Sequence, residues 1–173
     1  MRYTKTLLAL ALGTFVMGAR AQAPSDPQIV GIVVTANQID INAGKLALQK
    51  SHNAEVRKFA QDMVNDHTAV NKSVAQLGAK LHVTPAASPT QAALKKGAAE
   101  SEAHLKTLSG AEFDRAYVDH EVAYHQQVID AVKNTLIPSA QNADLKSALE
   151  GAAPMFQGHL EHAQHLQASL GSE

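Results

Sequence analysis

The chain has 173 residues, with 15 Lys or Arg against 16 Asp or Glu, and no cysteine. The absence of cysteine excludes disulfides, thiolate metal sites and cysteine catalysis, so packing must stabilise the fold. The formal net charge of −1 argues against nucleic acid as a partner.

The N-terminal segment has the features of a secretory signal peptide. A basic start containing Arg2 and Lys5 precedes an apolar run at residues 7–16 and a small-residue motif that permits cleavage after Ala21 or after Ala23. The apolar run is too short to cross a bilayer core of about 30 Å, and no later stretch reaches about 18 uncharged apolar residues. We therefore expect an exported, periplasmic protein without a transmembrane segment.

Removal of this segment leaves a chain of the size of one domain. We assign residues 1–23 to the signal peptide and residues 24–173 to a single helical domain. Loss of Arg2, Lys5 and Arg20 leaves 12 basic against 16 acidic residues, which is a net charge of −4.

Capping signals and apolar periodicity predict the first two long helices. Ser25 and Gln28 have capping-box spacing around Pro27, which predicts a helix from about Pro27 to Lys50. Asn53 can cap a second helix. Its apolar residues recur at three- and four-residue steps, at Val56, Phe59, Ala60, Met63, Val70, Val74, Leu77 and Leu81.

A breaker at residues 84–89 separates these helices from a shorter one rich in Ala and Lys, which should end near Leu108 and serve as a connector. Ser109 and Glu112 then form a second capping-box pattern, which opens another long helix. We expect Pro138 to stop that helix.

The last helix should begin near Asn142 and kink at Pro154, which removes one backbone hydrogen bond. No segment alternates with period two, so no strand is predicted. The fold class is therefore all-α: an antiparallel up-and-down four-helix bundle with a short additional connector helix.

Four polar residues occupy apolar stripes near the midpoints of the four long helices. They are Asp40, His67, His125 and His159, each three or four residues from apolar neighbours on the same face. Because the midpoints of bundle helices meet in one layer, we expect these side chains to converge inside the core.

A carboxylate facing three imidazoles suits one divalent transition metal, namely Zn, Fe, Mn or Cu. Glu121, one turn before His125, could add a ligand or orient that ring, and Tyr117 could donate to either carboxylate. Asp66 could support a ligand from outside the coordination sphere. The alternative is a buried hydrogen-bonded network without an ion, with Asp40 accepting from imidazole N–H groups.

Three stretches and several single positions resemble an exported bacterial family called domain of unknown function 4142. The stretches are residues 45–50, 59–68 and 108–118, and the positions are the Asp66-His67 pair, His125 and His159-Leu160. The resemblance covers nearly the whole mature chain. It implies a ferritin-like fold and an envelope location, but no known activity.

The chain departs from the di-iron pattern of ferritin-like proteins, which place Glu three residues before His on two helices. Val64, Val122 and Phe156 occupy those positions before the three core histidines. Asp40 stands where relatives of this family usually carry Glu. A di-iron centre is therefore not expected, whereas a mononuclear site fits.

Three functions remain open at this point. The leading hypothesis is a non-enzymatic periplasmic binding or stress-associated module whose His/Asp cluster holds one metal. The alternatives are a metal-dependent redox enzyme acting on peroxide or oxygen, and a cell-envelope protein-interaction module without metal. Oligomeric state and any envelope partner do not follow from the sequence.

Overall fold

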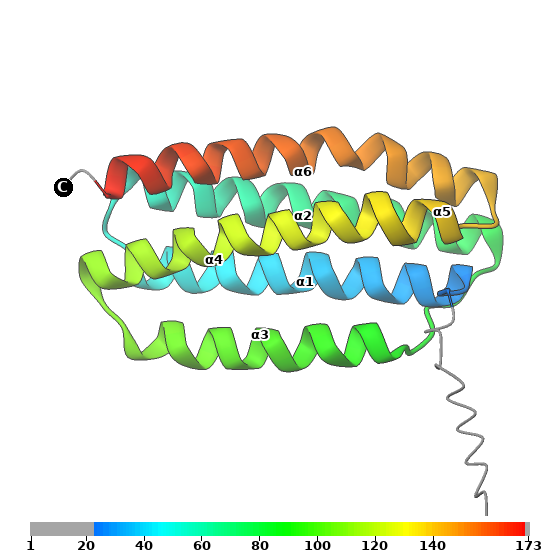
Figure 1. Ribbon diagram of the computed structural model, residues 1–173, viewed down its shortest axis with the longest axis horizontal. Helices are drawn as coiled ribbons and strands as arrows, with labels where there is room; N and C mark the ends of the chain where they lie inside the picture. Colours follow the sequence, from blue (N-terminus) through cyan, green and yellow to red (C-terminus); the bar gives the residue numbers. More distant parts are fainter. Residues whose placement is uncertain (1–22, 172–173) are drawn as a thin grey trace, which may run out of the picture.

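The computed structural model describes residues 23–171 as a bundle of helices (Figure 1). The helices are α1 (Asp26–Lys50), α2 (Ala54–Leu81), α3 (Pro89–Thr107), α4 (Gly110–Ala131), the π-helical η1 (Val132–Leu136), α5 (Ile137–Ser139) and α6 (Ala143–Leu170). The described residues contain no strand, and none of their helices is long and apolar enough to cross a membrane. The predicted signal peptide, apart from Ala23, lies outside the described residues.

Most of the predicted caps form. The Ser25 backbone N–H donates to Gln28 Oε1 at 3.0 Å, and Asn53 Oδ1 accepts from two backbone N–H groups at the start of α2. The predicted Ser109–Glu112 box is wrong, since the Ser109 side chain makes no capping bond at the start of α4. The chain instead enters α4 through Gly110, whose φ of +55° is a conformation that favours glycine.

The helix α3 determines the topology of the bundle. It returns the chain along the outside, so α2 and α4 run in the same direction while every consecutive pair of long helices is antiparallel (Figure 1). It packs against α1 and α4, and Leu105 is its one buried residue. The predicted connector is therefore a full crossover helix of 19 residues.

Pro138 and Pro154 lie in different helical surroundings. Pro138 does not stop the helix immediately, because α4 widens into η1, where the Ile137 N–H bonds to the Val132 carbonyl, and helical structure ends at Ser139. The wider turn relieves the clash between a proline ring and the preceding turn. Pro154 lies inside α6, which continues from Ala143 to Leu170. The kink expected there stays a prediction.

Two apolar clusters occupy the two ends of the bundle. One is built around Phe59, Phe113 and Val118, and the other around Ile29 and Leu136. Between them lies a buried polar layer, which consists of Asn37, Asp40, His67, Glu121, His125 and His159. The fold thus surrounds one polar level with apolar packing on both sides.

Candidate metal centre

The four polar residues predicted to converge all reach the polar layer. Asp40 comes from α1, His67 from α2, His125 from α4 and His159 from α6, and all four are buried. Each helix contributes from near its middle because the apolar residues three or four positions away fix which face turns inward.

The three histidines form the tightest group in this layer. Their ring centroids are 5.7 Å apart for His67 and His125, 5.2 Å for His67 and His159, and 5.4 Å for His125 and His159. One nitrogen from each ring lies within 4.8 Å of the other two. His67 also stacks on Phe156, which contributes an apolar wall.

Each imidazole has one nitrogen held by an acceptor. His67 Nδ1 lies 2.8 Å from Asn37 Oδ1, and His125 Nδ1 lies 3.0 Å from the Glu121 carbonyl oxygen. His159 Nε2 lies 2.9 Å from Asp66 Oδ2. Because amide, carbonyl and carboxylate oxygens accept hydrogen bonds, these three ring nitrogens carry the protons.

The second nitrogen of each ring is the atom that could bind an ion. His67 Nε2, His125 Nε2 and His159 Nδ1 have no hydrogen-bond partner within the described chain. Burial, followed by the nearby imidazoles, lowers the pKa of His67 to about 3, and burial lowers the pKa of His125 to about 4, so both rings are neutral. The lone pairs of these two neutral rings cannot bond to each other, which leaves a buried site that needs a donor or a cation.

Asp40 belongs to a second, overlapping group. One oxygen of its carboxylate lies 3.6 Å from His67 Nδ1. A carboxylate oxygen of Asp40, a carboxylate oxygen of Glu121 and a ring nitrogen of His125 all lie within 4.8 Å of one another. The structure thus places the four predicted residues in one layer, as two groups that share His125. Asp40 Oδ1 and both Glu121 carboxyl oxygens lack hydrogen-bond partners among residues 23–171.

Burial raises the pKa of both carboxyl groups. That of Glu121 reaches about 8, and that of Asp40 rises well above its ordinary value through burial and then through the charge of Glu121. Two buried carboxyl groups this close cannot both ionise cheaply. A cation in the layer would offset their charge.

The remaining predicted residues occupy supporting positions. Asp66 contacts His159 from the edge of the bundle, where its side chain is 46 % exposed. The Tyr117 hydroxyl is buried, and burial followed by the nearby charges of Glu121 and Asp40 raises the pKa of Tyr117. Asn37 was not among the predicted site residues; its Oδ1 contacts His67 Nδ1, and its Nδ2 donates to Asn71 at 3.1 Å. Its position three residues before Asp40 was the available signal.

Comparison with known proteins identifies similar folds. A DUF305 protein from Streptomyces coelicolor is 13% identical, covers 84% of this chain and 92% of its own, and has a TM-score of 0.69. CopM in the Cu(II)-bound form is 16% identical, covers 84% and 98%, and has a TM-score of 0.63. At these identities the likeness shows the ferritin-like helical fold alone.

No curated protein matches the sequence. The family model described as domain of unknown function DUF4142 matches residues 14–166, which is most of the chain. The chain therefore belongs to the DUF4142 family, as its motifs indicated.

Proposed function

We propose that this protein is a periplasmic metal-binding module that holds one divalent transition metal through His67, His125 and His159. The observation that carries the proposal is the set of three buried imidazoles, each with one ring nitrogen held by an oxygen acceptor and one ring nitrogen without a partner in the described chain. Imidazole ligands of metals are oriented in this way, with the second nitrogen donating to a carbonyl or carboxylate.

The alternative of a hydrogen-bonded core without an ion accounts for only half of these nitrogens. It explains the partnered N–H groups, but it supplies no hydrogen-bond partner for the second nitrogen of any of the three rings among the described residues. Leaving one buried acceptor unpaired costs about 1–3 kcal/mol, so three in one layer are a substantial burden without a ligand.

The donor set narrows the choice of ion. Neutral imidazoles favour Zn, Cu and Fe over Mg or Ca, and affinity for such sites peaks at Cu²⁺ in the divalent series. The similar fold of CopM was solved in a Cu(II)-bound form, which makes copper the first ion to test, with zinc second. Asp40 and Glu121 would add negative charge beside the ion. The signal-like N-terminus supports a periplasmic location.

Elemental analysis and copper or zinc titration of untagged protein, purified from the periplasm, test the proposal. We expect about one ion per chain in the wild type. His125→Ala should abolish this stoichiometric binding, since it removes the residue common to both ligand groups. His165→Ala, an exposed histidine on α6, is the matched control and should bind normally.

Circular dichroism should show that both variants remain helical. A wild-type protein that binds no ion, or equal binding by the wild type and His125→Ala, would contradict the proposal.

A further inference from the structure

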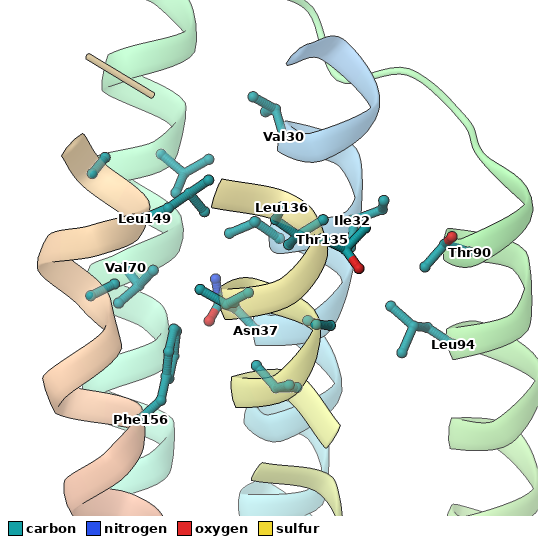
Figure 2. Close-up of a pocket in the computed structure, with 18 of the residues that line it drawn as sticks. Val30, Ile32, Asn37, Val70, Thr90, Leu94, Thr135, Leu136, Leu149 and Phe156 are labelled. Atoms are coloured by element: carbon teal, nitrogen blue, oxygen red, sulfur yellow. The ribbon is translucent and has the colours of Figure 1, made fainter. Parts of the chain in front are cut away.

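A cavity of about 240 Å³ extends from the polar layer toward one end of the bundle (Figure 2). Its walls are mainly aliphatic and come from α1, α2, α3, α4, η1 and α6. They include Val70, Val74, Val128, Leu136, Leu149 and Phe156. The π-helical turn η1 borders this space through Val132, Thr135 and Leu136, and such turns often occur at functional sites.

The polar end of this cavity is formed by Asn37, Asp40 and His67. The Asn37 amide is already occupied, because it contacts His67 through Oδ1 and Asn71 through Nδ2. Asp40 Oδ1 and His67 Nε2 have no partner in the described chain, although both residues are almost completely buried. A molecule in the cavity would therefore lie against the Asp40 and His67 side chains at one end and against hydrocarbon along its sides.

The dimensions limit the size of that molecule. An apolar cavity of about 150 Å³ accommodates benzene, so a cavity of this volume suits roughly ten non-hydrogen atoms. Thr90, Gln127 and Thr135 line the same space and are exposed, which gives it a route to solvent.

The charges limit the chemistry of its polar end. Asp40 and Glu121 place two carboxyl groups in the polar layer, and no Lys or Arg is among the described residues that line the cavity, so an anionic head group would be buried without a cationic partner. A neutral hydroxyl can donate to Asp40 or accept from it, and it can donate to the lone pair of His67. An alcohol or phenol on a compact apolar body satisfies all of these conditions.

We propose that the cavity is a binding site for a small neutral alcohol or phenol of about ten non-hydrogen atoms, whose hydroxyl lies against Asp40 and His67. This site does not rest on the proposed metal function, because the cavity is present in the metal-free chain. Its position beside His67 places the ligand next to the three-histidine group. A hydroxyl bonded to His67 Nε2 and a metal ion bound to the same atom would exclude each other.

The experiment is calorimetric titration of metal-free, full-length mature protein with 2-naphthol. We expect one molecule bound per chain. Leu149→Trp, which fills part of the cavity, should weaken binding at least tenfold. Leu108→Trp, at a partly buried leucine of the opposite cluster, makes the same exchange outside the cavity and should leave affinity unchanged.

Two further variants separate a loss of 2-naphthol binding from misfolding, and a failure of this proposal from a failure of the metal proposal. Val70→Phe narrows the cavity by a smaller change and should also weaken 2-naphthol binding, with thermal unfolding used to confirm the fold. His125→Ala does not line the cavity and should retain 2-naphthol while it loses metal.

Naphthalene-2-carboxylate should bind at least tenfold more weakly than 2-naphthol. The proposal is overturned if 2-naphthol does not bind, if both cavity variants bind it as well as the wild type, or if the carboxylate binds equally well.

Discussion

The contact between Asp66 and His159 connects the edge of the bundle to its buried layer. Asp66 is half-exposed on α2, and its carboxylate holds the Nε2–H of His159, which leaves Nδ1 free. A carboxylate in this position fixes the tautomer and orientation of an imidazole and increases its strength as a ligand. Asp66 is therefore a positioning residue in the proposed metal site.

Asp66→Ala should weaken metal affinity by about 10–100-fold while the stoichiometry stays near one ion per chain. The three imidazoles remain, but His159 loses the acceptor that orients its ring. Competition titration with a chelator measures the change. Asp62→Ala, one turn earlier on α2, is the control and should keep wild-type affinity; equal losses in both variants would refute the positioning role.

For single residues, the sequence predicted which side chains enter the polar layer but not which of them contact one another. Asp40, His67, His125 and His159 could be assigned to the core because apolar neighbours at helical spacing fix the face of each helix. The pairing of Asn37 with His67 and the division into two groups sharing His125 could not be predicted, since they depend on side-chain rotamers and on distances between helices. A polar residue on an apolar stripe gives no indication of which atom it will bond.

Close approach of α1 and α2 depends on Gly44. A Cβ at this position would lie 2.9 Å from the Ala60 carbonyl oxygen and 2.9 Å from a Val64 methyl group. The backbone oxygen cannot move without shifting the helix, so the two helices would have to separate. The glycine is thus a requirement of the interhelical contact.

Gly44→Ala should lower the free energy of unfolding by about 1–3 kcal/mol, because the overpacking outweighs the gain in helix propensity. Gly97→Ala in α3 should instead raise it by about 0.5–1 kcal/mol, since no atom lies within 4 Å of the added methyl group. Urea denaturation measures both. A Gly44 variant as stable as the Gly97 variant would show that the α1–α2 contact tolerates the methyl group.

The elements themselves were largely predictable from caps and periodicity. Ser25, Asn53 and Asn142 mark helix starts correctly, and the breaker before Pro89 separates α2 from α3. The π-helical turn before Pro138 and the direction of α3 could not be predicted from caps and periodicity. Both depend on how these segments pack against the neighbouring helices.

For the molecule as a whole, the buried titratable groups make stability depend on pH. The pKa of Glu121 is about 8 in the folded chain and near 4.5 when unfolded, so the unfolded chain loses this proton first. The contribution of Glu121 to the free energy of unfolding is complete below pH 4.5 and is lost as pH rises to 8. Asp40, whose pKa is also raised, changes the stability in the same direction. His67 and His125, with folded pKa values of about 3 and 4, act oppositely and destabilise the fold below pH 6.5.

Between pH 7 and 8 the histidine contributions change little, so the carboxyl groups dominate. We expect the Tm of metal-free protein to fall over this interval by on the order of 5 °C. Glu121→Gln should reduce the decline, because glutamine does not ionise. Scanning calorimetry measures it, with the exposed Glu112→Gln as control. A Tm that is independent of pH in the wild type would show that Glu121 is not held protonated.

The crossover along α3 divides the core into two hairpins, α1 with α2 and α4 with α6. His67 belongs to the first hairpin, whereas His125 and His159 belong to the second. An ion bound by all three would join the two hairpins at their middle. In a chain without cysteine, this ion would take the place of a disulfide: a reversible cross-link whose strength follows the supply of metal rather than the redox potential of the compartment.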